Sequence, residues 1–326
     1  MKKKILITTD IYNEIIIHLS KFFVVEENRE AKVLKEDELI QKLQGKSGVF
    51  SSPSNIFNEK VFKSCPKLKI VSNMAVGYNN IDIKAANESG VLITNTPDVL
   101  NEATADFGWA LILAAARRLT ESEIFLRANE WNEIRYDLFL GNDVNNTTLG
   151  IIGMGRVGQA IARRSIGFDM KVLYHNRSQL SSEIEANSNN AKFVSFKELL
   201  SQSDHILLML PYSKEVHHLI GLEEIKLMKP STSLINLARG GIINETDLIF
   251  ALKNKIIASA ALDVFENEPN FNQELLKLSN IVLSPHIGSA SKKTRLAMAY
   301  CASKNLIDTL IKLKPTNVIN KNSINK

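Results

Sequence analysis

A chain of 326 residues is long enough for two domains of ordinary size. Hydrophobic residues make up 44% of it and charged residues 23%, proportions that exclude an intrinsically disordered protein. The net charge of +5 comes from lysines spread along the chain, so we expect no nucleic-acid partner. No apolar run approaches the roughly 18 residues that a bilayer span needs, so we expect no membrane partner either.

The two cysteines, Cys65 and Cys301, lie far apart and form neither a C-x-x-C motif nor a cluster with histidine. This pattern predicts neither a disulfide framework nor a metal site, and it fits a reducing compartment. Asp10 and Glu14 interrupt the apolar start of the chain before it reaches the length of a signal peptide core. We therefore expect a cytoplasmic protein without a bound metal.

The first hundred residues alternate short apolar runs with amphipathic stretches. The apolar runs predict strands at residues 5–8, 48–51, 68–72 and 91–94. The helical spacing of apolar residues between these runs predicts helices at residues 36–43, 58–64 and 82–89. Such βα alternation predicts a parallel sheet covered by helices on both faces.

A long helix is predicted over residues 99–118, after a break at Pro97 and with Asp98 as its cap. Its many small residues indicate close packing in the core or against a second subunit. A second alternating series then predicts six strands, at residues 149–153, 171–175, 205–210, 233–237, 257–262 and 281–283. Six strands make a complete doubly wound unit. A final helix, residues 291–313, is expected to return to the first domain.

A glycine-rich loop opens the second series. Gly153, Gly155 and Gly158 form a G-x-G-x-x-G that follows a predicted strand and begins a helix, as a dinucleotide-binding site requires. The first glycine permits the tight turn, the second lets the backbone approach a pyrophosphate, and the third allows the helix to pack closely on the strand. The phosphates would meet the positive end of the helix, so Arg156 and Val157 are further candidate cofactor contacts.

The end of the next predicted strand bears on which dinucleotide binds. An NAD-dependent enzyme normally has an acidic residue there, which binds the ribose hydroxyls and repels a 2′-phosphate. This chain has Asn176, followed by Arg177 and Ser178. The repulsion is then absent, and Arg177 can donate charge-assisted hydrogen bonds to a phosphate. We predict a preference for NADP(H), with NAD(H) as the alternative.

Three segments near predicted strand ends carry polar residues in apolar surroundings, at residues 234–241, 261–269 and 283–289. In an open α/β sheet the ligand lies outside the carboxyl ends of the strands, so these segments are expected to meet near the glycine loop. Taken singly, each polar residue could be structural. Their joint placement favours a catalytic site.

The residue types in these segments suit the reduction of a 2-oxoacid, which needs a hydride, a proton donor and a cation for the carboxylate. Histidine, here His286, is the natural proton donor because imidazole titrates near neutrality. Arg239 offers a planar fork that matches a carboxylate. A carboxylate beside the histidine would fix its ring, but spacing alone does not choose between Glu266 and Glu268.

At these segments the chain resembles the D-isomer-specific 2-hydroxyacid dehydrogenases. The resemblance extends from about residue 48 to residue 313 and includes motifs at residues 76–82, 95–97, 102–106, 236–240, 262–269 and 285–289. It implies that Arg239, Glu268 and His286 are the catalytic residues. It also implies a set of substrate contacts, several through backbone amides, at Ala75, Val76, Gly77, Arg239 and His286.

The same resemblance implies further cofactor contacts. Thr104 would touch a cofactor phosphate, Asp263 the nicotinamide amide and Pro211 the adenine. The remaining candidate contacts in this group are Leu210, Leu237, Ala238, His286 and Ser289.

Within the family, the pairs Glu130-Trp131 and Thr294-Arg295 look most like the glyoxylate/hydroxypyruvate reductase and 2-ketogluconate reductase branch. We expect an NADP(H)-preferring reductase that converts small 2-oxoacids, glyoxylate or hydroxypyruvate, to D-2-hydroxyacids with His286 as proton donor. The alternatives are a 2-ketogluconate reductase, a D-3-phosphoglycerate dehydrogenase and, from another class, a nucleotide-sensing corepressor-like binding protein. A homodimer formed through the helix at residues 99–118 is expected by resemblance.

The predicted fold class is α/β, with two doubly wound parallel-sheet domains and a cleft between them. Residues 1–98 and 288–326 are expected to form a flavodoxin-like substrate-binding domain. Residues 99–287 are expected to form the NAD(P)-binding Rossmann domain.

Overall fold

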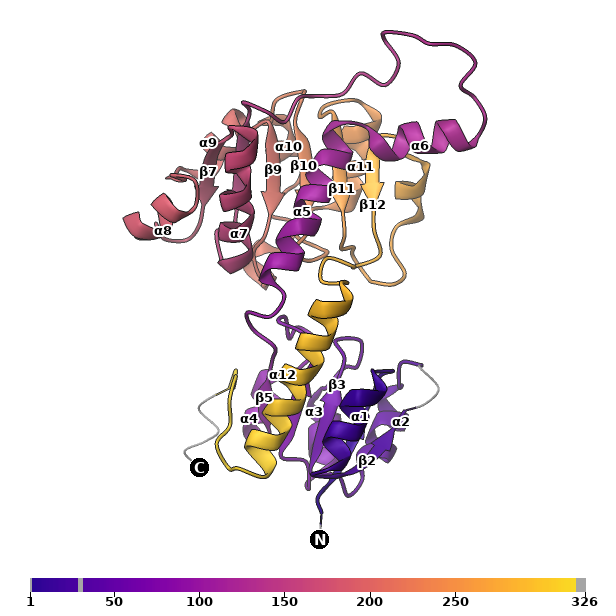
Figure 1. The fold of residues 1–326 in the computed structure, drawn as a ribbon, viewed down its shortest axis with the longest axis vertical. Coiled ribbons are helices and arrows are strands. Elements are labelled where there is room, and N and C mark those ends of the chain that lie inside the picture. The colour runs from indigo at the N-terminus through magenta and orange to yellow at the C-terminus, as the bar shows by residue number, and fades with distance from the viewer. Residues whose placement is uncertain (1, 29–31, 321–326) are drawn as a thin grey trace. The chain divides into compact units, whose positions relative to one another are not determined.

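The computed structural model describes residues 2–28 and 32–320 and separates into two compact units (Figure 1). The first unit comprises Met1–Leu100 and Ser291–Lys326, and the second comprises Asn101–Ala290. Residues 1, 29–31 and 321–326, which belong to the predicted substrate domain, lie outside the described residues. Each unit is built on one parallel sheet with helices, so the predicted fold class is confirmed.

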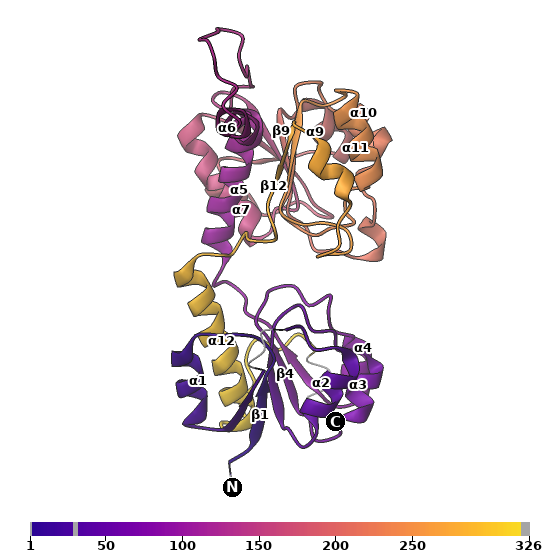
Figure 2. The same ribbon diagram turned by 90° about the vertical axis from the view of Figure 1, so that its right-hand side faces the viewer.

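The first unit has a five-stranded sheet in the order β2-β1-β3-β4-β5. Its strands are β1 Lys4–Ile7, β2 Val24–Glu27, β3 Gly48–Ser51, β4 Ile70–Asn73 and β5 Leu92–Thr94. Its helices are α1 Asn13–Ser20, α2 Glu36–Leu43, α3 Glu59–Ser64, α4 Ile83–Glu88 and α12 Lys292–Leu310. Figure 2 shows α1 and α12 on one face of the sheet and α2, α3 and α4 on the other.

Strand residues supply both cores of this unit because successive side chains point to opposite faces. Ile5 and Ile7 pack with residues of α1 and α12, whereas Leu6 packs with residues of α2, α3 and α4. The return of the last helix to the first domain is confirmed. The helix ends at the buried Leu310, so its predicted extension to residue 313 is wrong: Leu313 lies beyond the helix and is exposed.

The second unit has a seven-stranded sheet in the order β12-β11-β10-β9-β6-β7-β8. Its strands are β6 Thr148–Ile152, β7 Lys171–His175, β8 Lys192–Phe193, β9 His205–Leu208, β10 Ser233–Asn236, β11 Ser259–Leu262 and β12 Ile281–Leu283. Its α-helices are α5 Asn101–Ala116, α6 Leu119–Arg127, α7 Arg156–Arg164, α8 Ser182–Asn187, α9 Phe196–Gln202, α10 Leu222–Lys226 and α11 Glu245–Lys253. Short 3₁₀ turns occupy Ser165–Phe168, Lys214–Val216 and Gln273–Lys277.

The centre of this sheet is buried on both faces. Leu207 packs with residues of α5 and α7, and its neighbour Leu208 packs with residues of α9 and α11. The small residues of α5 allow it to lie close to α7: a Cβ on Gly108 would stand 3.1 Å from the side chain of Ile161. This helix begins at Asn101 rather than directly after Asp98. Within the described ranges, no helix is both long and apolar enough to cross a membrane.

Candidate active site

The glycine loop joins β6 to α7 and has the steric features of a phosphate cradle. Gly153 has a φ of 99°, and a Cβ there would stand 2.6 Å from the carbonyl carbon of Met209. A Cβ on Gly158 would stand 2.7 Å from the carbonyl oxygen of Gly153, so helix and loop touch here. A Cβ on Gly155 would meet nothing within 4 Å. Gly155 is the N-cap of α7, and because it has no side chain it caps none of the N–H groups at the start of the helix. The loop therefore leaves open space in front of the positive end of a helix.

Two further polar groups in this unit fit a dinucleotide. Thr104, in the first turn of α5, is buried, and its Oγ1 has no hydrogen-bond partner in the described part of the chain. Asn176 follows β7, and its Oδ1 accepts a hydrogen bond of 2.7 Å from the N–H of Met154. This bond orients the carboxamide and leaves its Nδ2 as a donor. The residues present can therefore hold phosphates at one point and a ribose at another.

His286 and Glu268 form a hydrogen-bonded pair after β12 and β11. The Nδ1 of His286 donates to Glu268 Oε2 over 2.7 Å, and the N–H of Phe265 donates to Glu268 Oε1 over 2.8 Å. Burial raises the pKa of Glu268, but the hydrogen bond and charge of His286, with smaller effects of Phe265 and Arg239, bring that pKa below its usual range. The carboxylate therefore stays ionised and holds Nδ1, which leaves Nε2 of the ring to carry a transferable proton.

The segment that carries His286 is held by Asp263, the residue after β11. Asp263 is buried, and its Oδ1 accepts from the hydroxyl of Ser284 at 2.7 Å and the N–H of Ile287 at 2.8 Å. Its Oδ2 accepts from the N–H of Gly288 at 2.8 Å. His286 itself has a φ of 54°, a left-handed conformation that is unfavourable for a residue with a side chain. Asp263 stabilises this conformation by bonding to the residues on both sides of the histidine.

Arg239 follows β10 and is partly buried. The side chain of Asn236 bridges this turn, because its Nδ2 donates to the carbonyl of Arg239 and its Oδ1 accepts from Ala238. Burial lowers the pKa of the guanidinium, and the nearby Glu268 carboxylate opposes this effect. One guanidinium nitrogen, Nη1, donates to the carbonyl oxygen of Ala238 over 2.5 Å. In the described part of the chain no carboxylate lies within ion-pair distance of Arg239, so the remaining N–H groups can bind an anion.

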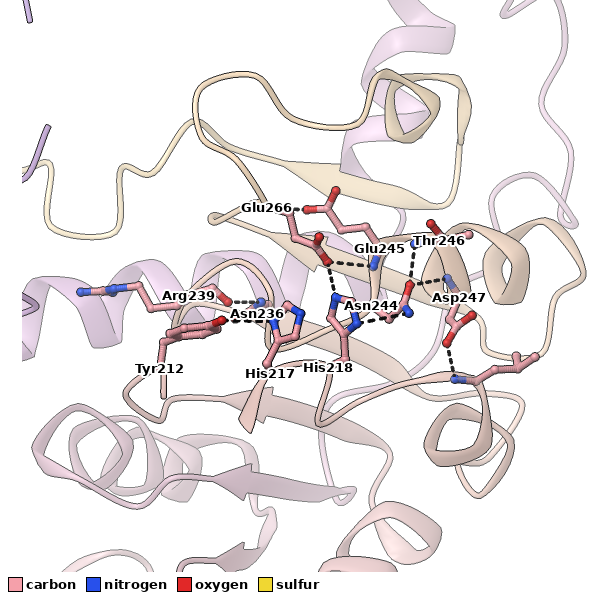
Figure 3. Close-up of polar contacts among 11 residues, drawn as sticks. Tyr212, His217, His218, Asn236, Arg239, Asn244, Glu245, Thr246, Asp247 and Glu266 are labelled. Atoms are coloured by element: carbon pink, nitrogen blue, oxygen red, sulfur yellow. Dashed lines mark hydrogen bonds and ion pairs between the residues drawn. The ribbon is translucent and has the colours of Figure 1, made fainter. Parts of the chain in front are cut away.

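A second polar cluster lies beside this turn, as Figure 3 shows. Glu266 accepts from His218 Nε2 at 3.0 Å, and the N–H of Glu266 donates to Glu245 Oε1 at 2.7 Å. Glu245 begins α11 and is buried, and burial together with the negative charges of Glu266 and Glu268 raises its pKa. Sequence spacing did not choose between Glu266 and Glu268 as the partner of His286. In the structure Glu268 is hydrogen-bonded to His286, and Glu266 is hydrogen-bonded to His218.

The other predicted contacts follow strand ends as well. Arg177 and Ser178 are exposed after β7, and Leu210 and Pro211 come after β9. Leu237 and Ala238 are buried after β10, while Ser289 comes after β12 and is partly exposed. The predicted cofactor contacts of the second unit are therefore Thr104 at the start of α5 and a set of residues at or near the carboxyl edge of one sheet.

The predicted carboxylate-binding residues belong to the first unit, in the loop that follows β4. The N–H groups of Ala75, Val76 and Gly77 have no acceptor in the described part of the chain. Val76 is also exposed, at 39% of its surface, although it is apolar. Such a run of unpaired amides can bind an anion.

Several residues that shape the site carry no signal in the sequence. Glu245 lies about twenty positions before Glu266, and nothing in the spacing indicates that its carboxylate would bond to that loop. Ser284 precedes Pro285 in a segment whose predicted site residues are His286 and Ser289. The bond between Asn176 and Met154 is also invisible in the sequence, although both residues lie next to motifs that were recognised.

Comparisons with known proteins find a family match in the second unit and relatives that are similar over nearly the whole chain. Residues 109–288 match the family model of the D-isomer specific 2-hydroxyacid dehydrogenase, NAD binding domain. The chain is 44% identical over 325 residues to a glyoxylate reductase of Thermococcus gammatolerans, covering 98% of this chain and 97% of that one.

Two solved structures extend the match to the whole fold. A glyoxylate reductase from Paecilomyes thermophila superposes with a TM-score of 0.88 at 32% identity, covering 98% of this chain and 99% of that one. An NADPH-dependent glyoxylate/hydroxypyruvate reductase from Sinorhizobium meliloti, solved with citrate, gives a TM-score of 0.85 at 30% identity and covers 98% of each chain.

Proposed function

The chain belongs to the D-isomer-specific 2-hydroxyacid dehydrogenase family and is an oxidoreductase that uses NAD(P), and we propose that it is an NADP(H)-preferring reductase of glyoxylate and hydroxypyruvate. The observation that carries this proposal is the His286–Glu268 pair, joined over 2.7 Å after the last two strands of the sheet that bears the glycine loop. Relatives with whole-chain similarity carry the name glyoxylate reductase, which supports the substrate.

The proposed roles follow from the contacts of each residue. A bound nicotinamide dinucleotide supplies the hydride that reduces the carbonyl carbon of the 2-oxoacid. His286 donates the proton from Nε2 to the carbonyl oxygen, and Glu268 stabilises the ring through Nδ1. Arg239, whose guanidinium makes no ion pair with a carboxylate of the described residues, binds the substrate carboxylate or polarises the carbonyl. In the first unit, the amides of Val76 and Gly77 are the proposed donors to a substrate carboxylate.

The dinucleotide is expected to lie against the glycine loop, with Thr104 Oγ1 donating to a phosphate. Glycolate, the product from glyoxylate, is achiral, whereas hydroxypyruvate gives a chiral glycerate. We expect the D-enantiomer from hydroxypyruvate. Chiral chromatography of that product checks the stereochemistry directly.

The direct test of the function is turnover. Purified wild-type protein is mixed with NADPH and glyoxylate, hydroxypyruvate, 2-ketogluconate or pyruvate, and the loss of absorbance at the nicotinamide band is followed. We expect the highest kcat/KM for glyoxylate or hydroxypyruvate. No turnover of any 2-oxoacid would overturn the proposal and favour a nucleotide-sensing binding protein.

Cofactor choice is argued from Asn176 and Arg177. Asn176 brings no negative charge, and its oriented carboxamide offers a donor. Arg177 is exposed and can bind a 2′-phosphate. A structural neighbour at 30% identity is NADPH-dependent by name, which supports the proposal. We expect kcat/KM to be higher with NADPH than with NADH, and Asn176→Asp to reverse this order through charge repulsion. A wild-type preference for NADH would contradict the assignment.

We also propose a homodimer, through a different surface from the one first expected. The small residues of α5 are occupied by contacts with α7 inside the same unit. By contrast, α6 has no buried residue, and the segment after it exposes Trp131 at 55% and Ile134 at 88%. Apolar exposure on this scale is typical of an interface. Light scattering should give the mass of two chains for the wild type, and the mass of one chain would refute the dimer.

A further inference from the structure

We infer that Asn95 and Asn73 are positioning residues that orient the N–H groups which bind the substrate carboxylate. Both lie in the first unit, at the ends of β5 and β4. Neither side chain is expected to touch the substrate. The inference rests on the proposed function, because it concerns how the same 2-oxoacid carboxylate is recognised.

The two asparagines bond to successive carbonyls of the loop after β4. The Nδ2 of Asn95 donates to the carbonyl oxygen of Val76, and the Nδ2 of Asn73 donates to that of Gly77, each over 2.9 Å. This loop has no regular secondary structure, so its carbonyls are not fixed by a helix or a strand ladder. The carboxamides take the place of such a ladder.

Fixing a carbonyl also fixes the N–H group on the other side of the same peptide bond. A peptide unit is planar, and in the trans form its C=O and N–H point in opposite directions. Holding the carbonyl of Val76 therefore aims the N–H of Gly77 away from Asn95. Holding the carbonyl of Gly77 in the same way aims the N–H of Tyr78 away from Asn73.

The first amide of the series is oriented by the main chain. The N–H of Thr96 donates to the carbonyl of Ala75 over 2.9 Å, which sets the N–H of Val76. The loop thus has three consecutive carbonyls occupied by protein donors. The N–H groups of Val76, Gly77 and Tyr78 have no acceptor in the part of the chain that the structure describes. A run of donors fixed before the ligand arrives binds an anion without the cost of ordering the loop.

Each asparagine is itself held in place. Asn73 is fully buried, and its Nδ2 also lies 3.5 Å from Oδ1 of Asn80, whose own Nδ2 donates to the carbonyl of Asn55. The backbone of Asn95 accepts a hydrogen bond from Asn305 on α12 over 2.9 Å. Asn73 is therefore held by contacts with Asn80, and Asn95 by a contact with α12.

The experiment compares Asn95→Ala with the wild type and with Asn58→Ala as the matched control. Asn58 lies in the same unit, where its side chain caps α3 by accepting from the N–H of Val61 and also donates to Glu36, so we expect its loss to affect stability alone. Glyoxylate KM and kcat are measured at saturating NADPH. Calorimetry measures the affinity of the NADPH-bound enzyme for oxalate, an unreactive carboxylate of similar size, and the affinity of the free enzyme for NADPH.

For Asn95→Ala we expect the KM for glyoxylate and the Kd for oxalate to rise at least about fivefold, as one carboxylate hydrogen bond loses its alignment. We expect kcat and the Kd for NADPH to stay within about twofold of the wild type. Asn58→Ala should change none of these values.

Unchanged KM and oxalate Kd in Asn95→Ala would overturn the inference. So would a fall in kcat with no change in KM, which is what a general loosening of the unit predicts. If the wild type binds oxalate but does not reduce glyoxylate, the proposed function is refuted. The inference about Asn95 is then still decided by comparing the oxalate affinities of the wild type and Asn95→Ala. A wild type that neither reduces glyoxylate nor binds oxalate would refute both.

Discussion

The contact between the Arg239 turn and the Glu268 loop depends on Gly240. A Cβ at this position would stand 1.8 Å from the carbonyl oxygen of Phe265 and 2.1 Å from its carbon, both backbone atoms. Ordinary contacts begin at 3.4 Å, so Gly240→Ala requires the two segments to separate by about 1.6 Å. A side chain could rotate away from such a clash, but a peptide group cannot.

We expect Gly240→Ala to destabilise the second unit by about 3 kcal/mol, at the upper end for overpacking. In a unit of this size that corresponds to a fall in Tm of roughly 6–12 °C. The catalytic effect should be larger still, because a displacement of about 1 Å between catalytic groups lowers kcat about 100-fold. Differential scanning fluorimetry and initial-rate kinetics measure the two effects.

Gly167→Ala is the control, because a Cβ there meets nothing within 4 Å. It should leave both Tm and kcat near the wild-type values. If Gly240→Ala matched the wild type in Tm and kcat, the two segments would not be in contact as described, and the account of how Arg239 is placed relative to Glu268 would fail.

Three further variants test the polar contacts of the second unit. In Asp263→Asn the oxygen that accepts from the N–H of Gly288 is replaced by an NH₂ donor. We expect the free energy of unfolding in urea to fall by about 1–3 kcal/mol and kcat to fall as well. A variant as stable as the wild type would refute this. The pKa of Glu268 is lowered, so its carboxylate stabilises the folded state above about pH 4.5 and this stabilisation is lost as pH falls through the lowered value. Glu268→Gln should therefore lower Tm at pH 7 but not at low pH. It should also reduce kcat, because His286 loses its hydrogen-bond partner. Burial raises the pKa of Glu245, so the folded wild type loses stability as pH rises above about 4.5 through that raised value. Glu245→Gln has no such group, so its Tm should gain on that of the wild type as pH rises through this range. A Tm difference independent of pH would contradict this.

The strands were predictable where burial dictates the sequence. β9 and β10 read as nearly continuous apolar runs because both of their faces are covered, and both lie in the middle of the sheet. β2 was missed because it lies at the edge of the sheet and only its first two residues, Val24 and Val25, are apolar, while Glu26 and Glu27 form its second half. β8 was missed because it has only two residues, and both are exposed. An edge strand forms because its backbone hydrogen-bonds to a neighbouring strand, and the sequence of the edge segment alone does not show that neighbour.

The site was predictable as far as strand ends determine it. Parallel strands deliver Arg239, Glu268 and His286 to one edge of the sheet, which the chain order already implies. The contacts that hold them come from distant positions, as Glu245 does for Glu266, and no local pattern specifies such pairs. Asp263 shows the same limit: its predicted contact with the nicotinamide stays a prediction, while its bonds to the His286 segment were not foreseen.

The central claim is that His286 donates the proton when a 2-oxoacid is reduced. The most direct measurement compares kcat for glyoxylate reduction, with calorimetric NADPH binding, in the wild type, His286→Ala and the control His18→Ala in the other unit. We predict that His286→Ala lowers kcat at least about 100-fold while NADPH binding stays within about twofold, and that His18→Ala behaves as the wild type. A kcat for His286→Ala equal to that of the wild type would contradict the account.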